Sequence, residues 1–173
     1  MRLTANALAV VLVALMVVPA LAERESGVSV EIVSIRASAP AGARGPAGKA
    51  IQIDPKLAGL GKKLSALFAY GRYTMVGRVS THAVFDRVST VELPERFILE
   101  IEPVARRGRG DRRIEMTITL VRDVRSTKDA PPPRSEDDIV LRTRLRLESG
   151  GTVLLGGPPI ESGTLILAVS ARD

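Results

Sequence analysis

The residues that could carry out catalysis are few. The chain has one histidine, His82, and no cysteine, which excludes thiol nucleophiles, thiolate metal sites and zinc sites built from several histidines. Neighbouring carboxylates occur at Glu100 and Glu102 and again at Asp137 and Asp138. Such pairs act as general acid and base where burial raises the pKa of one carboxyl group. We expect the first pair on the outer face of a strand and the second in a loop, and neither environment favours catalysis.

A lone imidazole such as His82 is typical of a surface or hydrogen-bonded residue, and the alternation around it places it opposite Tyr73 and Met75. A sugar hydrolase would also use aromatic platforms, yet the chain has no Trp and only 3% aromatic residues. The sequence therefore predicts that the protein is not an enzyme and has no catalytic residue, metal site or cofactor. The enzymatic alternative is a hydrolase with an unrecognised site, which requires a pocket holding two carboxylates about 5–9.5 Å apart.

Arginines are the residues best suited to binding. Arg142, Arg144 and Arg146 occupy alternate positions of a predicted strand, so their guanidinium groups stand roughly 6.6 Å apart on one face. Such a row could bind phosphates bidentately. It could instead lie in solvent or pair across the sheet with Glu100 and Glu102, and the sequence favours this second interpretation.

A second group of arginines, which includes Arg106, Arg107 and Arg109, lies within residues 106–113 and is typical of a charged turn between two strands. The formal net charge of +6 suggests acidic partners such as anionic lipid or polysaccharide. A composition rich in Arg, Ala and Gly, as a GC-rich genome imposes, is the competing explanation of this charge. Nucleic acid is a poor fit because no aromatic residues interleave with the arginines for base stacking.

The beginning of the chain has the three parts of a cleavable signal peptide over residues 1–22. Arg2 is followed by an apolar run over residues 7–18 and then by Pro19 and the small-x-small site Ala20-Leu21-Ala22. The apolar run spans about 18 Å, short of the roughly 30 Å of a bilayer core, which disfavours an uncleaved anchor. We expect an exported protein, periplasmic or secreted, whose residues 23–173 form one domain with no transmembrane segment.

Alternating apolar and polar residues predict strands through most of that domain. One polar face per strand is typical of antiparallel sheets with one face in water. In the first strand the alternation changes between Ile32 and Val33, which indicates a bulge or a change of buried face. Gly150-Gly151 is typical of a tight hairpin turn. Residues 156–163 are expected to link the last two strands. The predicted strands lie near residues 28–35, 73–81, 97–102, 114–121, 139–147, 152–155 and 164–171.

One amphipathic helix is predicted ahead of most of these strands. Asp54 is a suitable N-cap, and Pro55 follows at the first helical position. Five apolar residues recur at spacings of three and four and are expected to share one buried face. They are Leu57, Leu60, Leu64, Leu67 and Phe68. The expected fold is mainly β (α+β), an antiparallel β-sandwich of about seven or eight strands with this helix near the N-terminus.

The strands from residue 97 onward follow a recognisable order. They run from Phe97 to Val104, from Arg112 to Leu120, from Leu141 to Leu147 and then through Gly151 to Gly157. This series resembles the strands in the C-terminal domain of bacterial secretins, the outer-membrane secretion channels, over residues 97–157. Because the following Pro158 to Gly163 departs from the family pattern, the resemblance implies an accessory role in the envelope and not a channel subunit.

These features together predict an exported, non-enzymatic interaction or accessory protein of the bacterial envelope, linked to a secretion apparatus. The contact surface is expected on an edge strand or on the arginine-bearing strand face. A binding module for anionic envelope ligands that uses those arginines is the alternative. The sequence specifies neither the ligand nor the partner.

Overall fold

The computed structural model describes residues 26–40, 51–105, 113–124 and 136–173. The predicted signal peptide lies outside the described residues, as do Arg106, Arg107 and Arg109. The strands in the described part are β1 (Gly27–Pro40), β2 (Gln52–Ile53), β3 (Tyr70–Val84), β4 (Ser89–Leu93), β5 (Phe97–Val104), β6 (Arg113–Arg122), β7 (Ile139–Glu148), β8 (Thr152–Ile160) and β9 (Gly163–Arg172). The helical segments are η1 (Pro55–Leu60), α1 (Gly61–Leu67) and η2 (Glu136–Asp138).

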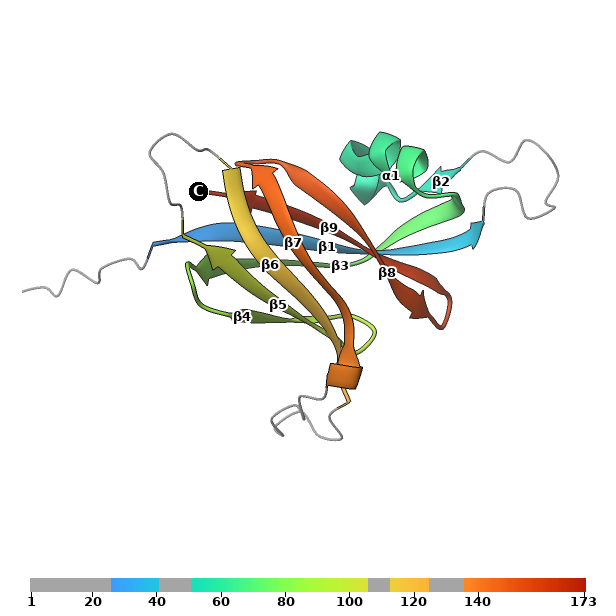
Figure 1. Ribbon diagram of the computed structural model, residues 1–173. Helices are drawn as coiled ribbons and strands as arrows, with labels where there is room; N and C mark the ends of the chain where they lie inside the picture. The colour runs from blue at the N-terminus through green and yellow to red at the C-terminus, as the bar shows by residue number, and fades with distance from the viewer. Residues whose placement is uncertain (1–25, 41–50, 106–112, 125–135) are drawn as a thin grey trace, which may run out of the picture.

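The strands form two sheets that pack as a sandwich (Figure 1). One sheet has the order β2-β3-β1-β9-β8 and the other β4-β5-β6-β7. Every pairing is antiparallel except that of the two-residue β2 with β3. The predicted mainly β sandwich is confirmed. The described strands number nine because β2 and the short β4 were not predicted.

The main core lies between the two sheets and is made by the inward positions of alternating strands. Leu99, Ile118 and Leu120 of the second sheet are fully buried there, opposite Ile32 and Val169 of the first. Burial of aliphatic side chains of this size stabilises a fold by roughly 1.5–3 kcal/mol each. The alternation seen in the sequence is therefore the pattern that builds this core.

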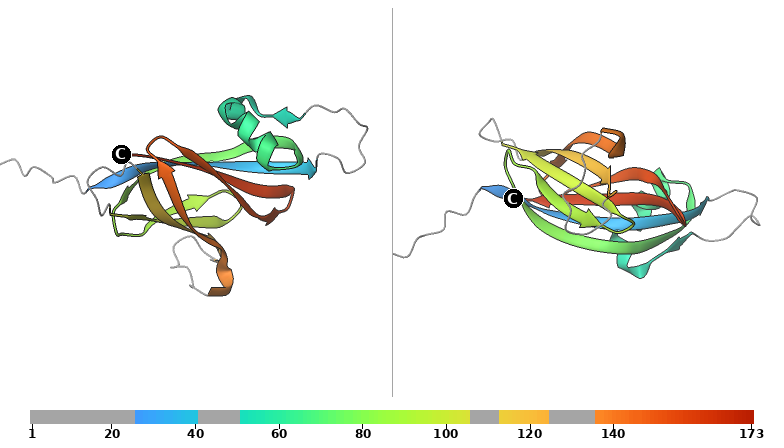
Figure 2. Two further views of the ribbon diagram at one scale, coloured as in Figure 1. Left: turned by 45° about the horizontal axis from the view of Figure 1, so that its top comes forward. Right: turned by 90° about the horizontal axis from the view of Figure 1, so that it is seen from below.

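A second, helix-side core lies on the other face of the first sheet. Figure 2 shows α1 on one side of that sheet and the four-stranded sheet on the opposite side. Val33, Ile35 and Ala37 of β1 point toward the helix and pack with Leu57 and Leu64. The predicted change of buried face after Ile32 is confirmed, because Val28, Val30 and Ile32 belong to the main core.

The change of face is accompanied by a bulge on β3. Ser34 pairs with Gly77 and Ile35 with Met75, so Val76 has no directly opposed residue. An extra residue reverses which face the following side chains occupy. Tyr73 and Met75 pack in the helix-side core, whereas Val79 packs against the main core. The prediction that alternate residues from Tyr73 to Thr81 share one face is therefore wrong.

The same bulge corrects the placement of His82. This residue pairs with Ser29, whose alternate positions along β1 lead to Ile35 and Ala37. His82 therefore lies on the same side of the sheet as Tyr73, not opposite to it, and it is exposed. A lone exposed histidine on an outer sheet face agrees with the expected surface position.

The helical segment begins where predicted but is divided in two. Asp54 accepts a hydrogen bond from the Lys56 backbone at 2.9 Å and caps η1, and α1 starts at Gly61. Glycine is a poor helix former, which explains why one continuous α-helix does not form across this stretch. Leu57 and Leu64 are buried as predicted, but Leu67 at the helix end is 65% exposed, so its predicted burial is wrong.

Tyr73 of β3 connects the end of α1 to the first sheet through a hydrogen bond. Its side chain is 1% exposed. The Tyr73 hydroxyl donates to the Phe68 carbonyl at 2.6 Å and accepts from the Tyr70 backbone N–H at 3.4 Å. Burial raises the pKa of the Tyr73 phenol, and the hydrogen bond from Tyr70 opposes that rise. The phenol is therefore held in its protonated, donating form.

Two turns differ from their predicted roles. The Gly151 N–H donates to the Glu148 carbonyl at 2.8 Å, with Gly150 at φ +81°, so the predicted tight turn is present. It joins β7 to β8, however, and these strands belong to different sheets. The stretch from Gly156 to Pro159 is part of β8 itself, with an irregularity in its pairing with β9.

None of the helices among the described residues combines the length and the apolar character that crossing a membrane requires.

Candidate interaction surface along strand β7

Four of the described strands lie at the ends of the two sheets, namely β2, β8, β4 and β7. Three of them are poor templates for a further strand. β2 has two residues and β4 has five, while Pro158 and Pro159 deprive β8 of two backbone N–H groups. β7 has ten residues with neither proline nor glycine. β3 also has no described strand on its outer side from Thr74 to Val84, because β2 pairs only with Arg72 and Tyr73, but this stretch contains Gly77 and a bulge. β7 is therefore, among the described residues, a long edge strand that is regular from Leu141 to Glu148, after an irregularity at Val140.

The arginine row, Arg142, Arg144 and Arg146, lies on the outer face of β7. All three side chains are exposed, and the residues between them, Thr143 and Leu145, face inward. The predicted strand and the predicted solvent-exposed face are both as expected. The row therefore runs along an edge strand, which joins two features that the sequence offered as separate candidates.

The predicted cross-strand partners of the row are not its neighbours. β6 lies between β5 and β7, and its Thr119 separates Glu100 from Arg142. Thr117 separates Glu102 from Arg144 in the same way. Glu100 and Glu102 are therefore not the cross-strand neighbours of Arg142 and Arg144.

The carboxylate next to the row is Glu115 on β6. Its Oε1 atom is 3.1 Å from Arg144 Nε, and the two side chains are 36% and 65% exposed. An exposed pair of this kind contributes about 0–1 kcal/mol. Glu115 lies opposite Arg146 in the register and reaches Arg144 diagonally. The pair therefore orients one guanidinium group while leaving most of it in water.

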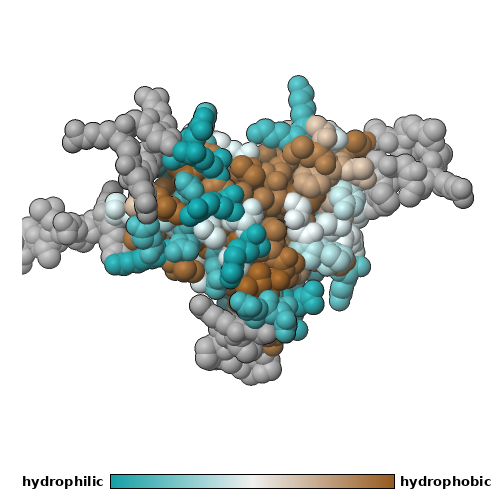
Figure 3. All heavy atoms as spheres, viewed as in Figure 1, coloured by the Kyte–Doolittle hydropathy of each residue, from teal (hydrophilic) through white to brown (hydrophobic). Residues whose placement is uncertain are grey.

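The main core is incompletely covered beside this edge. Seven half-buried apolar residues pack against it in the described part of the chain, and five of them come from β7 and β8. They are Val140, Leu141, Val153, Leu155 and Ile160. Figure 3 shows the resulting apolar surface around β8, next to hydrophilic side chains along β7. We call these five residues the apolar rim.

The carboxylates that were considered and rejected for catalysis do not assemble into a site among the described residues. Glu102 is exposed on the outer face of β5, and Asp137 and Asp138 lie in η2 before β7. Among the described residues, no group of three or more His, Cys, Asp or Glu side chains could hold a metal ion.

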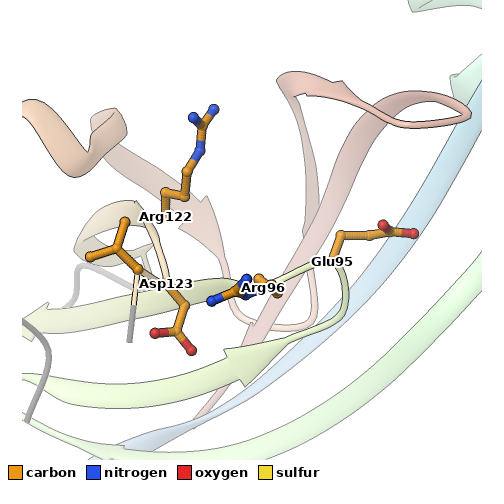
Figure 4. A pocket seen from close by; sticks show the side chains of 5 residues that line it. Glu95, Arg96, Arg122 and Asp123 are labelled. Atoms are coloured by element: carbon orange, nitrogen blue, oxygen red, sulfur yellow. The ribbon is translucent and has the colours of Figure 1, made fainter. Parts of the chain in front are cut away.

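A shallow hollow of about 370 Å³ lies at the turn between β4 and β5, lined by Glu95, Arg96, Arg122, Asp123 and Val124. Figure 4 shows the Glu95 and Asp123 carboxylates pointing away from each other. The Glu95 carboxylate instead bonds Arg36 of β1, with 2.5 Å between Oε1 and Nη2. This arrangement differs from the facing pair that a carboxylate hydrolase requires. The hollow therefore does not support the enzymatic alternative.

No family model, curated protein or solved structure matches this chain. The resemblance to secretins stays a prediction from the sequence.

Sequence reasoning missed two parts of this surface. Glu115 was visible as an outward residue of its strand, but its neighbour on β7 depends on the register of two strands joined by a long connection. The position of β7 at the edge has no local signal, because an edge strand and a central strand with one polar face have the same alternation.

Proposed function

We propose that this protein is an exported, non-enzymatic interaction domain of the bacterial envelope that binds an extended segment of a partner protein along β7. The observation that carries the proposal is the coincidence of three properties on one strand. β7 is a long edge without proline or glycine, the apolar rim lies beside it, and it bears the arginine row.

An edge strand presents unpaired backbone N–H and C=O groups, and an extended peptide can use them to add a strand to the sheet. Backbone hydrogen bonds supply the affinity of such a contact, and side chains at alternate positions supply its specificity. The added strand would also cover part of the apolar rim, which gives the contact a hydrophobic contribution.

Export is supported by the signal pattern over residues 1–22, and a role beside a secretion apparatus by the resemblance of residues 97–157 to secretin strands. Both supports come from the sequence alone. They suggest that the partner is another envelope protein.

A second candidate function is favoured by the arginine row itself. Three exposed guanidinium groups at alternate positions of one strand suit an anionic lipid headgroup or polysaccharide. This candidate needs the side chains of β7 but not its backbone edge. It predicts binding that weakens steeply as salt screens the charges.

The test is a pull-down from solubilised envelopes of the native host, with the full chain carrying a C-terminal tag, at low and at high salt. We expect a discrete protein that stays bound at high salt and is lost from the Arg144→Glu variant. Arg78→Glu is the matched control, because Arg78 is also an exposed strand arginine paired with a glutamate, Glu31, at 3.4 Å. Recovery of lipid or polysaccharide alone, released by salt, would overturn the proposal in favour of the second candidate.

A further inference from the structure

We infer that the segment accepted by β7 carries acidic side chains at every second position, with apolar side chains between them, and that β7 does not pair with β7 of a second copy of this chain. The inference rests on the proposed function and names the chemistry of the partner segment.

The outer face of β7 determines the acidic positions. A strand paired with β7 places alternate side chains on the same face as Arg142, Arg144 and Arg146, because directly opposed residues point to one side of a sheet. Opposite charges stabilise such cross-strand pairs, whereas lysine or arginine there would repel the row. Carboxylates two residues apart match the spacing of the row.

The inner face determines the apolar positions. The side chains between the carboxylates would point toward the space between the two sheets, on the side where Leu141, Val153 and Leu155 are half-buried. A charged side chain there would lose water without gaining a partner. Apolar side chains would instead complete the cover of the main core.

The same row prevents self-association along this edge. In an antiparallel pair of β7 with β7 from a second copy, the outer faces coincide, and in the register centred on Arg144 arginine stands opposite arginine at every outward position from Arg142 to Arg146. Like charges directly opposed across strands are destabilising, and natural proteins use charged edge residues to avoid edge-to-edge pairing. The edge therefore discriminates between an acidic strand and its own sequence.

The experiment measures binding of fluorescein-labelled eight-residue peptides to the full chain by fluorescence polarisation. The first peptide alternates Glu and Val, and the second has the same composition with Glu and Val in adjacent pairs. The paired order places glutamates on both faces of a strand. We expect the alternating peptide to bind at least about tenfold more tightly than the paired one, a difference of about 1.4 kcal/mol.

Replacing Arg142, Arg144 and Arg146 together by Ser should weaken binding of the alternating peptide at least about tenfold, while Arg78→Ser should leave it unchanged. Replacing the same three arginines by Glu should reverse the preference, so that an alternating Lys and Val peptide binds instead. This reversal is a gain of binding, which misfolding cannot produce. Sedimentation should show that the wild-type chain does not associate through β7 and that the three-Ser variant associates no less than wild type.

Amide hydrogen exchange separates failure of the inference from failure of the proposed function. Strand addition should slow exchange of alternate β7 amides when the alternating peptide binds. Equal binding of the two peptides with β7 protected would overturn the alternating pattern but support strand addition. Binding of either peptide without protection of β7 would overturn both, and binding of neither peptide would overturn the inference, while loss of the native partner from Arg144→Glu would still support the proposed function.

Discussion

The two halves of β1 are buried by different neighbours on opposite faces. In the first half, Val28, Val30 and Ile32 face the four-stranded sheet, and in the second half, Val33, Ile35 and Ala37 face α1 and η1. Among the described residues, the main core has 19 buried members and the helix-side core has eight. A cavity created by shortening a side chain in the helix-side core would lie closer to the boundary of that core. The surrounding residues could therefore collapse into the cavity more easily than in the main core.

The comparison shows how one sheet can serve two layers. Val76 adds one residue to β3 at the point where the buried face changes, so that β3 follows β1 from one core to the other. Strand β9 lies beside β1 and is buried on both faces, with Leu167 and Val169 in the main core and Ile166 and Ala168 in the helix-side core. A strand covered on both faces has a continuous apolar sequence and not an alternating one.

The largest expected effects come from shortening one fully buried leucine in each of the two cores. Leu99→Ala in the main core should lower the free energy of unfolding by about 3–5 kcal/mol, and Leu64→Ala in the helix-side core by about 2–3 kcal/mol, since both side chains are fully buried. Urea unfolding followed by circular dichroism measures both values. Equal losses would show that the helix-side core is as rigid as the main core and would break the comparison.

A smaller effect is expected at the turn between β4 and β5, where the second sheet contacts β3. A Cβ atom on Gly77 would lie 2.7 Å from Pro94 Cγ, so the turn between β4 and β5 packs closely on β3 and brings Glu95 to Arg36. Glu95→Ala should lower the free energy of unfolding by about 1–2 kcal/mol, because Arg36 loses its charged partner in a partly buried place.

The control for that change is Glu31→Ala, which removes the partner of Arg78 at 3.4 Å on the exposed outer face. Its expected cost is below about 1 kcal/mol. If the two substitutions cost the same, the bond between Arg36 and Glu95 does not hold the turn against the first sheet.

The smallest expected effect concerns Tyr73 and is distinguished by its pH dependence. Tyr73→Phe should lower the free energy of unfolding by about 0.5–1.5 kcal/mol near neutral pH, because the hydrogen bond to the Phe68 carbonyl is lost. Burial raises the pKa of Tyr73 in the folded state. Its contribution is therefore complete below about pH 10, the unfolded pKa, and is lost as the pH rises through the folded value.

Unfolding measured between pH 8 and pH 11.5, a range chosen around the tyrosine pKa of about 10, should show a steeper alkaline loss of stability in wild type than in Tyr73→Phe. Tyr70→Phe is the control, since its hydroxyl bonds Thr164 at 2.9 Å in a part-buried place. Parallel curves for wild type and Tyr73→Phe would show that the Tyr73 proton does not contribute to holding α1 on the sheet.

Much of the fold was predictable from local patterns. The alternation from Ile114 to Leu120 predicted β6 and its inward face, and Asp54 with Pro55 predicted the start of the helical segment. The exposed Leu67 was not predictable, because helical spacing shows which residues share a face but not how far the sheet beneath them extends. The bulge at Val76 was missed for a similar reason, since it exists in relation to β1 and has no residue signature of its own.

The candidate surface divides in the same way. The outward direction of Arg142, Arg144 and Arg146 follows from their alternate spacing on one strand. Their pairing with Glu100 and Glu102 was a reasonable expectation that failed because β6 lies between the two strands. Strand order is a property of the whole chain, and no spacing within β5 or β7 encodes it.

The sequence by itself determined most of the secondary structure, the faces of the regularly alternating strands and the positive charge along β7, because these depend on residue type and on the two-residue period of a strand. Only the tertiary structure decided that β7 is an edge, that the apolar rim lies beside it and that β1 buries opposite faces in its two halves. Those properties depend on which segments distant in the sequence pack together, and hydrophobic burial specifies that packing through the whole set of contacts and not through any one segment.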